Sequence, residues 1–309
     1  RLMPVVRRLL LLLAIALLAA SCSSSDTLAT VNGTEITKDD LVALRPSYDE
    51  KSSLDAETVR SDLSLLIVME AMRTAAEEQF GAVITEDDVD ERLANPPERY
   101  AAVIAPPSEF ADITDEAVRA SATQSLIRDA VVPELAAMEP GGLEGLLTDT
   151  PQEVTRVCVR HIATASVGEA TQAMERLQAG EDFEAVAAEV SLDQASPGGL
   201  ITNEEGECLV WLGRAGEEFA FLAATAPINE PAGPVVSGGG WDVILVIDRD
   251  GPSSLAELEA DPMEYLARDY IGILYTPWAN DAIREAEIDV SPTVGRWSEA
   301  GVGIAPPGE

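Results

Sequence analysis

Two segments of the chain show the hydrophobic pattern of β-strands. Residues 156–162 alternate as Arg-Val-Cys-Val-Arg-His-Ile, and residues 241–247 form a nearly continuous apolar run, Trp-Asp-Val-Ile-Leu-Val-Ile. Patterns of this kind predict strands that are buried on one face or on both. Between them, residues 166–177 and 183–190 read as helices. The stretch 156–249 is therefore predicted to fold as an α+β unit.

The flanking segments are mainly helical. Residues 28–36 predict two short strands that turn at Asn32-Gly33, and Thr37 is placed to cap a helix. Gly81 is a typical helix C-cap after a long amphipathic segment. Helices are predicted over 55–80, from 85 to about 93, from 114 to about 135, and from 262 to about 286. The buried face of the last helix is expected to contain Tyr265, Leu266, Tyr270, Ile273 and Leu274.

Helices before and after the central stretch are expected to pack together, which makes that stretch an insertion into a helical domain. The predicted organisation is a helical domain over 27–150, an inserted α+β domain over 151–250, and a returning helix and strand over 251–298. Residues 143–151 are expected to be a linker, and residues 299–309 a loose tail.

Charge and composition narrow the classes of function. The 55 acidic residues exceed the 20 basic ones and give a formal net charge of −35. Such a surface repels phosphate backbones, so no nucleic-acid partner is expected. It favours solubility, with a preference for cationic or neutral partners as the alternative. The sequence contains no zinc-type Cys/His cluster, no phosphate-binding loop and no nucleophile elbow, so neither a metal nor a small-molecule cofactor is expected.

The first 21 residues resemble the signal peptide of a bacterial lipoprotein. Arg7-Arg8 precede an apolar run, Leu9–Leu18, which is shorter than the roughly 20 residues that span a bilayer. Small residues then lead to Cys22, as in a lipobox. The resemblance implies a lipid anchor on Cys22, a tether over 22–26, and a location on the outer face of the cell membrane. An ordinary cleaved signal peptide is the alternative.

Cys158 and Cys208 are the other cysteines of the chain. Outside the cytoplasm they could form a disulfide, but a sequence does not give the distance between their Cα atoms. The pairing stays open at this point.

The central stretch resembles the parvulin-type peptidyl-prolyl isomerases. The motifs that carry the resemblance are Val159–Ile162, Gln178–Phe183, Ala187–Ser191, Pro197–Leu200, Trp211–Arg214, Gly233–Val235 and Gly240–Leu245. Residues 29–37, followed by helices, resemble the chaperone domain of PrsA/SurA-type foldases. The resemblance implies a small antiparallel sheet packed with helices, carried by a chaperone-like helical domain.

The resemblance also implies a site. His161 corresponds to the first of two family histidines and Asp193 to the cysteine or aspartate beside it, whereas Asp242 stands where the second histidine is usual. Trp211 and Phe219 correspond to the substrate-binding pocket, with Phe221 as the alternative to Phe219. Two carboxylates beside one imidazole would raise its pKa. The competing readings are a structural histidine, a solvated Asp242, and a Phe219 that only fills the core.

Two functions are compatible with these residues. One is the isomerisation of X-Pro bonds in unfolded or newly exported proteins, a rotation with an unaided barrier of roughly 18–20 kcal/mol. The other is a holdase that binds unfolded chains through a degenerate parvulin domain.

Overall fold

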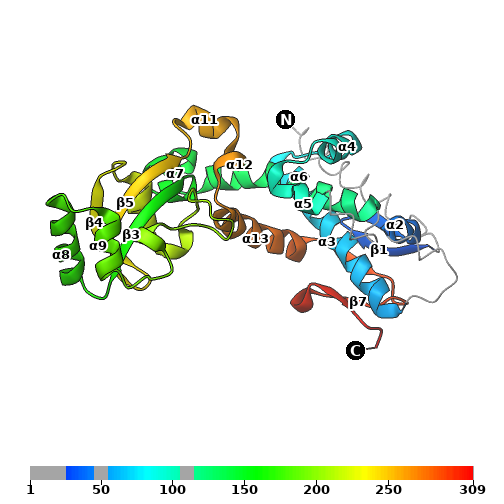
Figure 1. Cartoon of the computed structure of the whole chain (residues 1–309). Coiled ribbons are helices and arrows are strands. Elements are labelled where there is room, and N and C mark those ends of the chain that lie inside the picture. Colours follow the sequence, from blue (N-terminus) through cyan, green and yellow to red (C-terminus); the bar gives the residue numbers. More distant parts are fainter. Residues whose placement is uncertain (1–25, 45–54, 105–114, 309) are drawn as a thin grey trace, which may run out of the picture. The chain divides into compact units, whose positions relative to one another are not determined.

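The computed structural model describes residues 26–44, 55–104 and 115–308 (Figure 1). The signal segment and Cys22 lie outside these ranges. The fold combines helices with small antiparallel sheets, which confirms the predicted α+β class. In the described ranges, no helix combines the length and the apolar character that crossing a bilayer requires.

The chain divides into two compact units. The first unit contains the described residues up to Ile127 and those from Ala279 onward, and the second unit contains Arg128–Trp278. Helices α6 (Asp115–Met138) and α13 (Arg268–Glu285) contribute residues to both.

The first unit is built around a three-stranded antiparallel sheet with the order β2-β1-β6. Besides parts of α6 and α13, its elements are β1 (Thr27–Val31), β2 (Thr34–Thr37), α2 (Lys38–Leu44), α3 (Ala56–Phe80), α4 (Glu86–Ala94), α5 (Glu98–Ile104), β6 (Ile288–Val290), β7 (Arg296–Ser298), the 3-10 turn η5 (Glu299–Gly301) and β8 (Gly303–Ala305).

Local sequence signals set the ends of these elements. Asn32 and Gly33 have positive φ angles of 50° and 86°, as the two-residue turn between β1 and β2 requires. Asp55 caps α3 by accepting a 2.8 Å hydrogen bond from the Thr58 N–H, and Gly81 ends this helix in the left-handed conformation. These predicted boundaries are confirmed.

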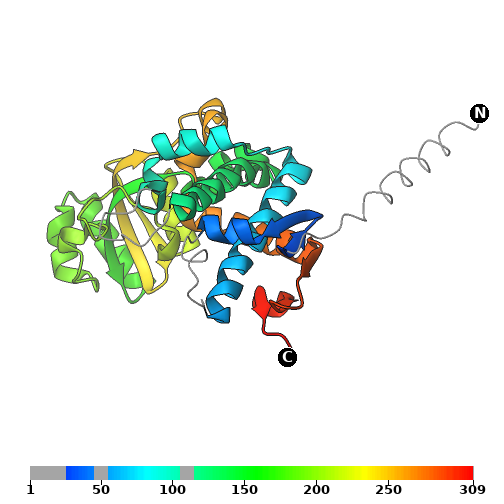
Figure 2. The same cartoon turned by 90° about the vertical axis from the view of Figure 1, so that its right-hand side faces the viewer.

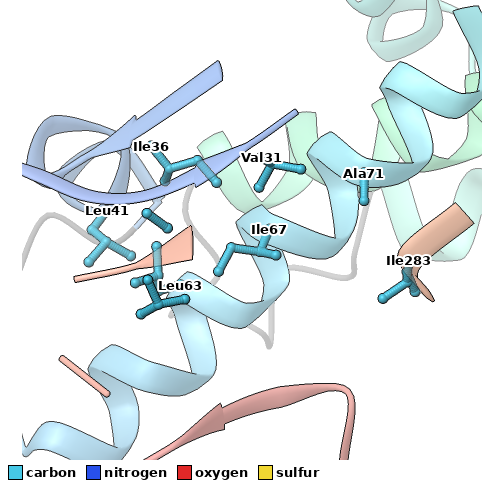
Figure 3. Close-up of a cluster of buried hydrophobic side chains, with 9 residues drawn as sticks. Val31, Ile36, Leu41, Leu63, Ile67, Ala71 and Ile283 are labelled. Carbon is cyan, nitrogen blue, oxygen red and sulfur yellow. The ribbon is translucent and has the colours of Figure 1, made fainter. Parts of the chain in front are cut away.

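The core of the first unit lies between α3 and the sheet (Figure 3). Leu63, Ile67 and Ala71 follow one another at a spacing of four residues, so they share one face of α3. All three side chains are fully buried. They pack in one cluster with residues of β1, β2, α2 and α13, namely Val31, Ile36, Leu41 and Ile283. The returning chain therefore completes the core that the N-terminal segments begin.

The end of the chain is not the loose tail that its glycines and prolines predict. Strand β8 pairs antiparallel with β7, and the Ile304 N–H donates a 3.1 Å hydrogen bond to Ser64 Oγ on α3. Pairing with β7 and this contact with α3 satisfy backbone groups of the segment, which explains why it is ordered.

The second unit contains a three-stranded antiparallel sheet with the order β3-β5-β4. Its strands are β3 (Arg156–Thr164), β4 (Pro231–Ser237) and β5 (Gly240–Asp250). Its shorter helices and 3-10 turns are α7 (Gly142–Thr148), η2 (Pro151–Glu153), α8 (Val167–Gln178), α9 (Phe183–Val190), η3 (Pro197–Gly199), η4 (Gly213–Ala215), α10 (Glu217–Thr225), α11 (Leu255–Ala260) and α12 (Pro262–Tyr265).

Helices cover both faces of this sheet. Along β5, Val243 packs in a cluster with α8 and α9, whereas Ile244 and Val246 pack with α10. The alternation follows from the period of two along a strand. Figures 1 and 2 show α8 and α9 (green) next to β3 and β5.

Two predictions for this unit are wrong. Residues 143–151 are not a linker, because most of them form α7, which contacts α11 and η2. The helix predicted over 262–286 is interrupted at Leu266, which is extended (ψ 128°), and the Ala267 N–H donates to Glu153 O. Helix α13 starts after this interruption, at Arg268. Ile273 is 65% exposed, so it does not belong to the buried face of the helix as predicted.

A disulfide joins Cys158 on β3 to Cys208, and their Cα atoms are 4.6 Å apart. This distance lies within the usual range for the bond. The bond ties the irregular segment after Gly199 to the central sheet.

Replacing both Cys158 and Cys208 with alanine should destabilise the second unit. The disulfide restricts the unfolded chain by closing a loop of 50 residues, and losing this restriction should lower the free energy of unfolding by about 4 kcal/mol. Urea unfolding followed by circular dichroism measures it, and wild type with a reductant should unfold like the double variant. If a reductant leaves the wild-type midpoint unchanged, the two cysteines are not joined.

Candidate active site

His161 and Asp242 meet because β3 and β5 are adjacent. In their register His161 lies opposite Ile244, and Ala163 lies opposite Asp242, so the two side chains are diagonal neighbours on one face of the sheet. His161 Nδ1 and Asp242 Oδ1 are 2.7 Å apart. This is the face that α10 covers.

Asp193 reaches the other nitrogen of the imidazole from the loop after α9. The Leu192 N–H donates to Ala163 O at 2.8 Å, and the Ala163 N–H donates to Ser191 Oγ at 3.1 Å. These two bonds hold the loop against β3. Asp193 Oδ2 then lies 2.8 Å from His161 Nε2.

Ser196 completes the surroundings of Asp193, and the sequence analysis did not identify it. Its hydroxyl donates a 2.6 Å hydrogen bond to Asp193 Oδ2, and the Ala195 N–H donates to Oδ1 at 2.8 Å. An aspartate followed by a serine three residues later is a common turn pattern and could have suggested the contact. The hydrogen bond from Ser196 and the neighbouring His161 lower the pKa of Asp193 to about 2.

The surroundings of His161 favour the charged form of its imidazole. Burial by itself would lower the pKa of His161, but the hydrogen bonds to Asp242 and Asp193 outweigh it and raise the pKa above the ordinary 6.5. One imidazolium between two carboxylates leaves one excess negative charge. Asp242 is only 2% exposed, so the reading of it as a solvated strand residue is wrong.

A cavity of about 620 Å³ opens beside this network. Its apolar wall comes from Leu192, Ile201, Ala215 and Phe219. The ring of Phe219 stands at 87° to the imidazole of His161, with 6.2 Å between centroids, and is 1% exposed. Phe219 therefore belongs both to the core and to the cavity wall.

The other two aromatic candidates lie elsewhere. Phe221 is 39% exposed and does not line this cavity. Trp211 does not line it either, because it follows Val210, whose backbone pairs with Val157. Val157 precedes His161 by four residues, about 13 Å along a strand. The predicted substrate contact of Trp211 is therefore not part of this cavity.

Gly199 lets the chain cross close to His161. Its φ is +75°, and a Cβ atom there would lie 2.3 Å from His161 O. Only glycine fits both constraints. This close approach accounts for the Pro-Gly-Gly motif beside the site.

The site is not arranged as a metal centre. Over the described ranges, no three His, Cys, Asp or Glu side chains are placed to hold an ion. Both ring nitrogens of His161 already lie within hydrogen-bond distance of carboxylates, so neither is free to bind an ion. What the arrangement offers is an apolar cavity with a fixed negative charge at one wall.

Residues 160–248 match the sequence model of the rotamase family described as the PPIC-type PPIase domain. They form a parvulin-type domain.

The chain is also similar to individual proteins, over different shares of its length. The foldase protein PrsA 1 of Lactobacillus johnsonii is 24% identical over 249 residues, which are 79% of this chain and 76% of that protein. The parvulin-like PPIase of Rickettsia bellii is 31% identical over 100 residues, 30% of this chain and 33% of that protein. The crystal structure of PrsA from Bacillus anthracis covers 72% of this chain and 96% of its own, with 17% identity and a TM-score of 0.41.

The protonation of the parvulin-type domain can be measured directly, because His161 is the single histidine of the chain. In a protein without a histidine tag, an NMR titration of its Cε1–H signal should give a pKa above 6.5. Asp242→Asn should lower that pKa, because it removes one carboxylate. A wild-type pKa at or below 6.5 would contradict the charged network.

The matched control is Asp248→Asn, an exposed position on the same strand, which should leave the titration unchanged. The same shift makes the stability of the fold depend on pH. Because the pKa of His161 is higher in the folded protein than in the unfolded chain, its contribution to stability is complete below pH 6.5 and is lost as the pH rises through the folded pKa. Asp193 acts oppositely, and its contribution is lost as the pH falls toward about 2.

Proposed function

We propose that this protein is an extracytoplasmic folding factor that binds unfolded exported proteins and isomerises their X-Pro bonds at the His161 cavity. The observation that carries the proposal is the apolar cavity of about 620 Å³ with the His161–Asp193–Asp242 network in its wall. Its occurrence in a parvulin-type domain supports the reaction, and the names of the PrsA relatives support a role in folding.

The reaction needs no covalent chemistry from the protein. Rotation about the X-Pro bond breaks amide resonance, at a cost of roughly 18–20 kcal/mol. The planar amide is more polar than the twisted amide, because resonance moves negative charge onto the carbonyl oxygen. A cavity walled by Leu192, Ile201, Ala215 and Phe219 replaces water around the amide, so it disfavours the planar form more than the twisted one.

The charge of the network acts in the same direction. Twisting returns electron density from the oxygen to the nitrogen, so an excess negative charge near the oxygen raises the free energy of the planar amide more than that of the twisted one. Both ring nitrogens of His161 already bond carboxylates, and Asp242 is buried. We assign these two residues to holding the charge, and Asp193, whose side chain is 28% exposed, to facing the substrate.

A holdase is the second candidate, and the identity of residue 242 favours it. Asp242 replaces the second histidine of the family, so the arrangement of two imidazoles is absent. An apolar cavity can bind an unfolded chain without lowering any barrier. Rate and binding must therefore be measured separately.

Isomerase activity on a short Xaa-Pro peptide separates the two functions. His161→Gln and Asp193→Asn should each lower kcat/KM roughly tenfold or more, the effect of about 1.4 kcal/mol in the barrier. Neutral amides are chosen because they keep the size of the side chain and limit unfolding. The exposed Asp248→Asn is the control and should keep the wild-type rate.

The holdase reading makes the opposite prediction. If wild type and both variants match the uncatalysed rate while each still suppresses aggregation of an unfolded protein, the isomerase assignment is wrong. Asp242→His restores the family residue, and a gain in rate would show that the altered cluster limits activity.

We also propose that Cys22 carries a lipid that holds the protein on the outer face of the cell membrane. Two acyl chains bind a bilayer far more firmly than one. Cys22→Ser should therefore move most of the protein from the membrane fraction to the soluble fraction of bacterial cells, whereas Ser24→Ala should not. An unchanged membrane fraction for Cys22→Ser would exclude this anchor.

A further inference from the structure

A second cavity, of about 560 Å³, lies in the same compact unit and shares no lining residue with the His161 cavity. Helix α10 borders both cavities. Phe219 faces the first, whereas Phe221 and Leu222, two and three residues further along the helix, line the second. A ligand could therefore bind here without entering the His161 cavity.

The walls of this second cavity combine apolar surface with acids. Phe221, Leu222, Pro234 and Val235 supply the apolar part, and Phe221 is 39% exposed, a large apolar ring open to solvent. The carboxylates come from Asp149, Glu217 and Glu218. No basic side chain is among the described residues that line the cavity. Charge complementarity therefore selects a cation that is attached to something apolar.

Gln152 gives an independent sign of a missing ligand. It lines the cavity and is 8% exposed, yet its buried Oε1 has no hydrogen-bond partner. A buried acceptor without a donor costs about 1–3 kcal/mol, so nearly all such groups are paired in folded proteins. A bound N–H group would satisfy it, and a polypeptide backbone provides such groups at every residue except proline.

Glu153, the residue after Gln152, has a pKa that responds to burial and to nearby carboxylates. Burial, with Asp269 and Glu217 nearby, raises the pKa of Glu153 above its ordinary value. Glu217, one of the acids that line the cavity, contributes to this shift, so a cation bound beside Glu217 would lower the pKa of Glu153.

We infer that this cavity is a second polypeptide-binding site, which takes a lysine or arginine together with an adjacent apolar residue of an unfolded chain. The apolar side chain packs on Phe221 and Leu222, a backbone N–H donates to Gln152 Oε1, and the cation lies near Glu217 and Glu218. The inference rests on the client-binding part of the proposed function and is independent of isomerisation.

Titration calorimetry with a proline-free peptide tests the site on the full chain. The probe is acetyl-Gly-Phe-Lys-Leu-Gly-amide, and its partner has Glu in place of Lys. The lysine peptide should bind, and more weakly as salt increases, while the glutamate peptide should not. Equal binding of the two peptides would overturn the inference.

Variants locate the binding. Glu217→Gln with Glu218→Gln should weaken the lysine peptide about five- to tenfold, as expected for two partly exposed ion pairs. Both side chains are exposed, so the fold should tolerate the change. Glu204→Gln with Glu205→Gln, an acidic pair that is also exposed but lies outside the cavity, is the matched control and should not alter binding. Equal effects of the two pairs would mean attraction to net charge alone and would overturn the site.

Gln152→Met separates a binding role from a structural one. It replaces an amide whose buried Oε1 is unpaired with an apolar side chain of similar size, so the urea midpoint should stay the same or rise while peptide binding weakens. A loss of stability would show that the amide has a structural partner, which contradicts the inference.

The histidine signal distinguishes the two cavities. The lysine peptide should leave the Cε1–H resonance of His161 unmoved, and the Glu217/Glu218 variant should keep any isomerase rate of the wild type. A shift of the histidine signal would place the peptide in the other cavity and overturn the inference. An inactive enzyme that still binds the lysine peptide would refute isomerisation alone.

Discussion

A carboxylate buried beside an imidazole is the constraint on which the central sheet and its site depend. Asp242 is almost fully removed from water, and an ionised carboxylate in such a place needs a charged partner and hydrogen bonds. His161 supplies both, but only while the register of β3 against β5 keeps the two residues diagonal. The loop after α9 must in turn hold Asp193 against the other nitrogen. Register, loop and protonation state are therefore coupled.

The same coupling gives the site its chemical character. With a second histidine at position 242 the cluster could be neutral, whereas with Asp242 it carries a fixed negative charge beside an apolar cavity. Such a site has no nucleophile to offer and no free imidazole nitrogen to act as a base. What it can do is change the relative free energies of amide conformers, or only bind them. The isomerase and the holdase differ in how large that effect is.

Helix α10 contributes residues to the walls of both the His161 cavity and the second cavity. One part of it buries Phe219 against the sheet, and the neighbouring residues leave Phe221 and two glutamates in contact with solvent. Acids in the first turn also suit the positive end of a helix, so Glu217 and Glu218 have a structural reason as well. The buried Oε1 of Gln152 has no such reason, since it has no hydrogen-bond partner among the described residues. Gln152 is therefore stronger evidence for a bound ligand than the acidic pair.

Much of this fold could be predicted from the sequence, because its signals are local. The Asn32-Gly33 turn, the caps at Asp55 and Gly81 and the alternation along β3 each depend on a few adjacent residues. The parvulin motifs also marked His161 and Asp193 as site candidates.

Only the tertiary structure decided which distant segments meet. The burial of Asp242, the hydrogen bond from Ser196, the Cys158–Cys208 bond and the order of the C-terminal strands depend on distances between side chains that no local pattern encodes. The exposure of Ile273 and the unpaired oxygen of Gln152 are likewise set by what packs against them. The sequence by itself determined the elements and the candidate residues, and packing determined their charge state, their burial and their partners.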